Sequence, residues 1–208
     1  MLKDRDGSCF KETKMKTLLE RRGTIAERRP RILIAGMGNI LLKDDGVGVH
    51  AVKRFPQANG QEYRTVEVGC AVFDALYLFD WAERILLIDA MQAGGPPGTV
   101  YRVDSLKDMD MGTMPASLHE FSVIQALEMI QKDPRPAVSI IGIEPEIIDY
   151  GLELSKTVEA SLPLVWETGR EVVRKWIMEY ENRGAVDASD GFVGKKPILA
   201  ERTSVSRL

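Results

Sequence analysis

Two carboxylates and an imidazole stand where buried segments of this sequence give way to polar residues. Asp45 follows the apolar run of residues 32–35, and Asp89 closes a second apolar run, residues 84–89. His119 comes after a Met- and Asp-rich loop. Carboxylate and imidazole groups are a suitable ligand set for a borderline divalent cation such as nickel or zinc. Asp45, Asp89 and His119 are therefore candidate metal ligands.

Each of these side chains also has a purely structural interpretation. Asp45 and its neighbour Asp44 could cap the helix that follows, because an Asp oxygen accepts the free N–H groups of a first helical turn. Asp89 could accept a structural hydrogen bond, since an unpaired buried carboxylate would be costly. A protonated His119 at a helix start would oppose the helix dipole, whereas a neutral, ligating imidazole would not. The residues alone leave both interpretations open.

Four other polar side chains could contribute to a site. Cys70 ends a predicted strand, so a catalytic thiol is conceivable, but no histidine lies near it in the sequence. Glu120 and Asp74 could support a metal ligand or act as a general base. His50 lies in the middle of a predicted helix, where we expect it to face solvent.

The glycine turn Gly36–Gly38 raises the alternative of a nucleotide-binding site. A dinucleotide fingerprint needs a third glycine, and Leu41 occupies that position. Asp44 and Asp45 would also repel a pyrophosphate. The charge at this turn therefore favours a cation or a polar peptide, and the glycines leave room for another chain to approach closely.

Apolar periodicity predicts alternating strands and helices over residues 31–181, with crossovers long enough to be parallel and right-handed. This pattern predicts an α/β fold: a doubly wound, mostly parallel sheet with helices on both faces, in a single domain. Ligands bind such sheets beyond the carboxyl ends of the strands, where we expect Asp45, Asp89 and His119 to meet. The predicted strands are 32–35, 63–68, 84–89, 99–103 and 137–143. The predicted helices are 46–55, 72–79, 118–131 (inner face Phe121, Ile124, Leu127 and Ile130, cap Ser117) and 155–181, with a break expected near Pro163.

Composition and the chain ends add a few expectations. The 208 residues carry a net charge of −3, which gives no reason to expect a nucleic acid or a membrane surface as partner. No apolar run approaches the roughly 18 residues of a membrane span, the charged N-terminus does not resemble a signal peptide, and two cysteines fit a cytoplasmic location. We expect residues 1–30 to be a polar N-terminal extension, 31–181 the α/β domain and 182–208 a polar C-terminal tail.

Several motifs, in order, resemble those of the hydrogenase maturation endopeptidases, the processing proteases of nickel-iron hydrogenase large subunits. The resemblance covers about residues 31–180, and the set of motifs is specific although each one alone is weak. The motifs are Gly36-Met-Gly-Asn-Ile-Leu-Leu-Lys-Asp-Asp-Gly-Val-Gly48, Leu87-Ile-Asp-Ala90, Ser117-Leu-His-Glu120, Gly142-Ile-Glu-Pro-Glu146 and Gly151-Leu-Glu-Leu-Ser155.

This resemblance implies a doubly wound α/β enzyme that removes a C-terminal peptide from a hydrogenase large subunit precursor after nickel insertion. It implies that Asp45 (where many relatives carry Glu), Asp89 and His119 form the catalytic and metal-binding trio, and that the nickel arrives with the substrate. The cation could polarise the scissile carbonyl or lower the pKa of a water molecule. Asp45 or Glu120 could take the proton of that water, and the precursor tail could pass along the glycine turn.

Two other functions remain as alternatives. A non-proteolytic nickel-sensing chaperone for the same precursor would bring the trio together without cleaving the precursor. A nucleotide-binding module would bind an anion at the glycine turn and would not bring the trio together.

Overall fold

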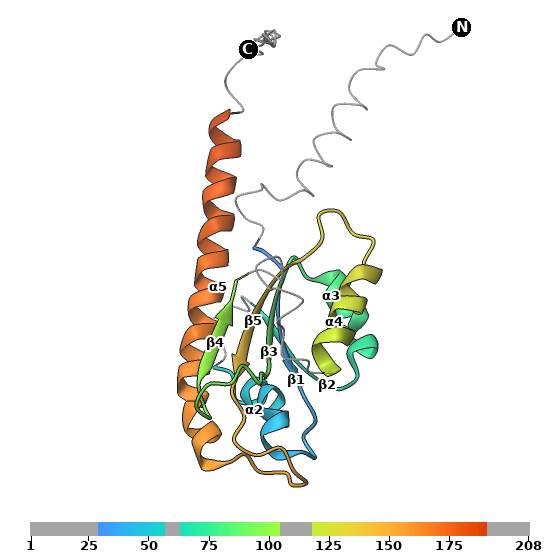
Figure 1. Ribbon diagram of the computed structural model, residues 1–208. Helices are drawn as coiled ribbons and strands as arrows, with labels where there is room; N and C mark the ends of the chain where they lie inside the picture. The colour runs from blue at the N-terminus through green and yellow to red at the C-terminus, as the bar shows by residue number, and fades with distance from the viewer. Residues whose placement is uncertain (1–28, 57–62, 105–117, 191–208) are drawn as a thin grey trace, which may run out of the picture. The chain divides into compact units, whose positions relative to one another are not determined.

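One five-stranded sheet lies at the centre of the described chain (Figure 1). The computed structural model describes residues 29–56, 63–104 and 118–190. The strand order is β2-β1-β3-β5-β4, and the predicted α/β class with a mostly parallel sheet is confirmed. The strands are β1 (Ile32–Met37), β2 (Arg64–Gly69), β3 (Arg84–Ala90), β4 (Val100–Val103) and β5 (Ala137–Ile143).

The strand directions follow from the crossovers. β1, β2, β3 and β5 are mutually parallel, as the long connections between them predict. β4 lies at the edge and runs antiparallel to β5, with Val100 opposite Ile143. The two central strands β1 and β3 are buried almost throughout, which explains their unbroken apolar sequences.

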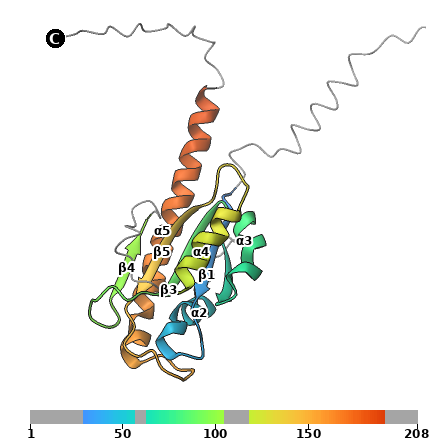
Figure 2. The same cartoon turned by 45° about the vertical axis from the view of Figure 1, so that its right-hand side comes forward.

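Helices cover both faces of the sheet, so each face has its own core (Figures 1 and 2). Successive residues of a strand point to opposite faces. Ile32 and Ile34 accordingly pack with α2 and α5, whereas Leu33 and Ala35 pack with α3 and α4. The helices are α2 (Val47–Lys53), α3 (Leu76–Trp81), α4 (Leu118–Met129) and α5 (Lys156–Asp190), and short 3₁₀ helices η2 (Lys43–Gly46) and η3 (Val72–Ala75) precede α2 and α3.

Glycines let α2 approach the sheet more closely than other residues would allow. A Cβ atom on Gly48 would lie 2.0 Å from the carbonyl oxygen of Ile88, and one on Gly36 would lie 2.3 Å from that of Gly48. Gly38 has a φ of +103°, and its Cβ would lie 1.7 Å from the carbonyl oxygen of Asp45. The space beside the glycine turn is thus filled by this chain's own backbone. The expected passage of a precursor tail along Gly36–Gly38 stays a prediction.

The inner face of α4 is offset from the predicted one. Val123, Ala126 and Ile130 are buried and Leu127 is half-buried. Of the predicted inner-face residues, Leu127 and Ile130 are confirmed. Phe121 and Ile124 lie outside the described side chains. The spacing 123, 126 and 130 is itself helical, and Ala126 was not predicted because a small apolar residue contributes little to a hydrophobic pattern.

Helix α5 runs without a break through Pro163, so the expected interruption is wrong. A proline removes one backbone hydrogen bond and normally kinks a helix. Here Val158, Leu162 and Val165 on either side of Pro163 are fully buried against the sheet. This packing holds the helix in place across the missing bond.

The chain divides into two compact units, Arg28–Tyr180 and the combination of Met1–Glu27 with Glu181–Leu208. The first unit contains the sheet and its covering helices. Of the second unit, the structure describes residues 181–190, which continue α5. Among the helices of the described residues, none combines the length and the apolar character needed to cross a bilayer.

Candidate functional site

The strand order places a site beyond the carboxyl ends of β1 and β3. After β1 the chain forms β2 on one side of β1 and then β3 on its other side. Parallel α/β sheets bind ligands at this reversal of strand order. Asp45 lies on η2 directly after β1, and Asp89 is the penultimate residue of β3. The sheet topology thus brings two of the predicted site residues to one edge of the sheet.

Asp44 is fully buried and has a structural role. Its Oδ2 oxygen accepts hydrogen bonds from the N–H groups of Glu146 (3.0 Å) and Ile147 (2.8 Å), and its Oδ1 oxygen accepts one from Ser155 (2.7 Å). The expected N-cap is therefore wrong, because this carboxylate binds a distant loop rather than its own helix. Three charge-assisted bonds fix the loop of residues 144–155 beside η2.

Asp45, the neighbouring carboxylate, is half-buried and points toward the glycine turn. Its Oδ2 oxygen accepts the N–H of Asn39 at 2.8 Å, and the Asn39 side chain in turn accepts the N–H of Leu41 at 3.0 Å. No side-chain hydrogen bond caps η2 or α2, both of which the structure describes, so Asp45 is not a cap either. The turn holds the Asp45 carboxylate in one orientation at the edge of the sheet.

Asp89 is a buried carboxylate with 4% of its surface exposed. Its Oδ1 oxygen accepts the N–H of Ala90 at 2.9 Å. By strand alternation it shares a face with Ile85 and Leu87, the face covered by α3 and α4. The structural hydrogen bond expected of a buried carboxylate is thus present, and the side chain lies on the face where α4 begins.

The thiol of Cys70 lies within electrostatic range of both Asp45 and Asp89. This exposed thiol follows β2, and its pKa is raised by partial burial and by the negative charges of both Asp45 and Asp89. Two carboxylates on different elements, η2 and β3, raise the pKa of one thiol only if both lie within electrostatic range of it. The raised pKa keeps the thiol protonated and therefore opposes the interpretation of Cys70 as a catalytic nucleophile.

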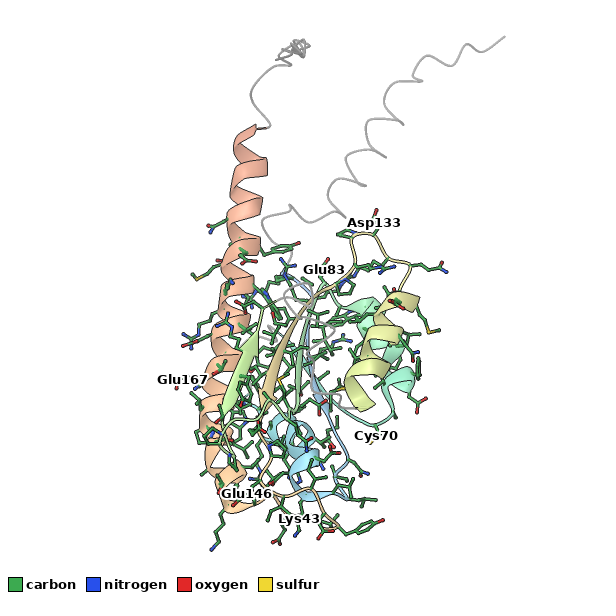
Figure 3. All side chains as sticks on the ribbon, in the orientation of Figure 1. Lys43, Cys70, Glu83, Asp133, Glu146 and Glu167 are labelled. Atoms are coloured by element: carbon green, nitrogen blue, oxygen red, sulfur yellow. The ribbon has the colours of Figure 1, made fainter. Side chains whose placement is uncertain are left out.

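His119 belongs to the first turn of α4, at the carboxyl end of the sheet, but its side chain and that of Glu120 lie outside the described side chains. The convergence of His119 with Asp45 and Asp89 therefore stays a prediction. Among the described residues no group of three His, Cys, Asp or Glu side chains could hold a metal ion. In Figure 3, Cys70, Lys43 and Glu146 lie toward one end of the sheet, and Glu83 and Asp133 toward the other.

The sequence interpretation missed Glu144, a buried carboxylate after β5. It accepts hydrogen bonds from the N–H groups of Ala93 (2.9 Å), Gly94 and Gly95 (both 3.3 Å) and from the Tyr101 hydroxyl (2.9 Å). Burial raises the pKa of Glu144, but these four donors outweigh burial and leave the pKa lowered. Glu144 thereby fixes the loop that follows Asp89. A sequence signal existed, because Glu144 directly follows a buried apolar strand.

His50 does not face solvent as expected. It is half-buried, its Nε2 atom is buried without a hydrogen-bond partner among the described residues, and it forms a hydrogen bond with the backbone of Leu152. Burial, followed by the nearby charges of Lys53 and Arg54, lowers its pKa. A neutral His50 thus forms a second connection between α2 and the loop of residues 144–155.

Comparison with known proteins shows the family to which the chain belongs. The family model of the hydrogenase maturation proteases matches residues 49–171, a range that includes Asp89 and His119. The chain belongs to this family. It is similar to the hydrogenase expression/formation protein HupD of Rhizobium leguminosarum bv. viciae, with 32% identity over 71% of this chain and 76% of the relative. The chain is thus a hydrogenase maturation endopeptidase, a hydrolase, as the motifs implied.

Solved structures agree with the fold. The [NiFe] hydrogenase maturation protease HybD from Thermococcus kodakarensis is 28% identical, with a TM-score of 0.58 over 69% of this chain and 99% of the other. The hydrogenase maturating endopeptidase HybD from E. coli is 22% identical, with a TM-score of 0.60 over 70% of this chain and 93% of the other, a likeness of fold alone.

Proposed function

We propose that this endopeptidase removes the C-terminal extension of a nickel-iron hydrogenase large subunit precursor after nickel has been inserted. In this proposal the nickel is part of the substrate, and Asp45, Asp89 and His119 recognise it. The observation that supports the proposal is that Asp45, oriented by the N–H of Asn39, and the buried Asp89 both lie at the reversal point of the sheet. The enzyme is placed in the cytoplasm, where the precursor is made, and needs neither a nucleic acid nor a membrane as partner.

The donor chemistry of the site suits this substrate. Carboxylate and imidazole ligands bind borderline cations such as nickel without a thiolate. The Cys70 thiol beside the carboxylates stays protonated because burial and both negative charges raise its pKa.

The chain's own residues supply positioning and proton transfer. The Asn39 N–H and the Ala90 N–H orient the Asp45 and Asp89 carboxylates before the substrate arrives. A bound cation supplies Lewis acidity toward the scissile carbonyl or the attacking water. The half-buried Asp45 is placed to take the proton of that water, a step that contributes about 10²- to 10⁴-fold to a rate. Hydrolysis then needs no covalent intermediate with the protein.

The test is cleavage of the nickel-loaded precursor, followed by mass spectrometry of the large subunit. Asp45→Asn, Asp89→Asn and His119→Gln each remove one ligand at nearly constant size, and each should lower the cleavage rate by about 10²-fold or more. Asp80→Asn is the matched control, because Asp80 is an exposed carboxylate on α3 to which no role in the site is assigned. It should cleave at the wild-type rate.

Two results would overturn the proposal. Full cleavage by the Asp89→Asn and His119→Gln variants would remove the trio from the mechanism. Tight binding of the nickel-loaded precursor by the wild-type protein without any cleavage would instead indicate the chaperone alternative.

A further inference from the structure

A patch of exposed apolar side chains lies beside the site. More than half of the exposed large apolar side chains among the described residues come from two short segments, residues 40–41 and 147–152. Tyr150 is the extreme case, with 85% of its surface exposed. We call this set the apolar patch; it consists of Ile40, Leu41, Ile147, Ile148, Tyr150 and Leu152.

Backbone hydrogen bonds join the two segments into one surface. The Lys43 N–H donates to the carbonyl of Gly151 (2.9 Å), the Gly151 N–H donates to that of Leu41 (3.0 Å), and the Asp44 N–H donates to that of Ile147 (3.2 Å). Leu42 and Gly151 accordingly form a parallel β-bridge. The apolar side chains thus come from adjacent segments of the folded chain, although more than 100 positions separate Leu41 from Gly151 in the sequence.

Hydrogen bonds hold one segment of the patch in place, and a residue beside the patch has an unfavourable backbone conformation. Asp44 fixes the segment 146–155 through three hydrogen bonds from inside the molecule. Lys43 has a φ of +47°, a left-handed conformation that is unfavourable for a residue with a side chain. Its side chain lies so close to Gly151 that a Cβ atom there would be 2.9 Å from the lysine Cε. An ordered, strained loop that exposes apolar side chains is typical of a binding surface.

The patch adjoins the proposed catalytic residues and has a charged rim. Ile40 and Leu41 lie on the turn that joins Asn39 to η2. The N–H of Asn39 binds the Asp45 carboxylate, so the patch begins next to this proposed site residue. Exposed acidic side chains lie within the other segment and on either side of it, and they outnumber the half-buried Lys43 beside Gly151: Glu146, Asp149 and Glu153. An apolar centre within a polar rim is the usual anatomy of a protein–protein interface. The negative rim favours a partner with basic side chains around an apolar face.

We propose that the apolar patch docks the folded body of the large subunit precursor, through an apolar face of the precursor bordered by basic side chains. This inference rests on the proposed function. A precursor that carries its nickel must be folded around the metal, so the protease contacts a surface as well as a peptide. Docking at the patch places the precursor body next to Asp45, where the bond to be cleaved has to lie.

The test uses the full chain and the nickel-loaded precursor. The double variant Leu41→Ser/Tyr150→Ser should raise the Kd for the precursor, measured by biolayer interferometry, by about tenfold or more. KM should rise equally while kcat stays near the wild-type value, because docking contacts are the same in the ground and transition states. Met178→Ser is the matched control, since Met178 on α5 and Leu41 are both 56% exposed. Added salt should weaken wild-type binding because the rim is charged.

Three other outcomes would contradict either the docking proposal or the proposed function. If the wild-type enzyme cleaves the precursor and the double variant binds and cleaves it equally well, the docking proposal is wrong and the proposed function stands. If light scattering shows that the patch instead joins two copies of this chain, and the double variant is monomeric with unchanged precursor affinity, the docking proposal is also wrong. If the wild-type protein neither binds nor cleaves the precursor, the proposed function itself fails. Equal thermal unfolding of the three proteins excludes a folding defect.

Discussion

At the scale of single residues, neighbouring carboxylates in this chain have different tasks because their surroundings differ. Asp44 is fully buried and holds three backbone N–H groups of a remote loop, whereas Asp45 is half-buried and lies at the edge of the sheet. The sequence shows two identical side chains in a row. It cannot assign their tasks, because the partners of Asp44 lie more than 100 residues away.

Asp44→Asn should destabilise the protein by about 1–3 kcal/mol, because an amide cannot accept all three hydrogen bonds and leaves buried N–H groups without a partner. Urea unfolding monitored by circular dichroism measures this change. Asp149→Asn is the control, since Asp149 is exposed and should shift stability by no more than about 0.5 kcal/mol. Equal stability of the two variants would show that Asp44 does not hold the loop.

His50 should make stability depend on pH. Burial, Lys53 and Arg54 lower its pKa in the folded protein. As the pH falls through the ordinary value of 6.5, His50 therefore binds a proton in the unfolded chain before it does so in the folded chain. The contribution of neutral His50 is thus complete above pH 6.5 and is lost as the pH falls through the folded pKa.

The measurement is the difference in unfolding free energy between the wild type and His50→Gln. The unfolding free energy of the wild type should fall relative to that of His50→Gln as the pH is lowered from 7.5 through 6.5 and below. The comparison cancels the effects of groups that titrate alike in both proteins. A difference that stays constant with pH would contradict the assignment of His50 as a buried neutral group.

At the scale of elements, the sequence predicts most of the fold. Continuous apolar runs predict β1, β3 and β5, and the helical periods predict α2, α4 and α5, because burial alone determines these patterns. The uninterrupted α5 was not predictable, since its continuity through Pro163 depends on packing against a sheet formed by distant residues. The site was only partly predictable: Asp45 and Asp89 follow strands, whereas the loop anchor Glu144 has partners that only the tertiary structure reveals.

The packing of α2 on the sheet makes a prediction at this scale. Gly48→Ala should destabilise the protein by about 1–3 kcal/mol, because its Cβ would meet the backbone carbonyls of Ile88 and Met37. Helix propensity alone would predict a gain in stability of about 1 kcal/mol. The sign of the measured change therefore shows whether steric overlap or helix propensity is the larger effect. In Gly169→Ala the new Cβ meets the side chains of Phe55 and Leu86, which can move, and the loss should be smaller. Thermal unfolding of both variants tests this order.

At the scale of the whole molecule, three features lie at one end of the sheet: the reversal of strand order, the two carboxylates and the apolar patch. In the proposed function, the reversal creates the site and the carboxylates supply its chemistry; in the docking proposal, the patch binds a folded partner. Asp44 and His50 link these features, because both connect the α2 region to the segment that carries the patch.

The most direct test of this account compares one large subunit precursor in its nickel-loaded and nickel-free forms. Each form is incubated with the wild-type enzyme, and mass spectrometry records the release of the C-terminal peptide. The account predicts release from the nickel-loaded precursor and none from the nickel-free precursor, because the metal is what the carboxylates and His119 recognise. Equal release from both forms would contradict it.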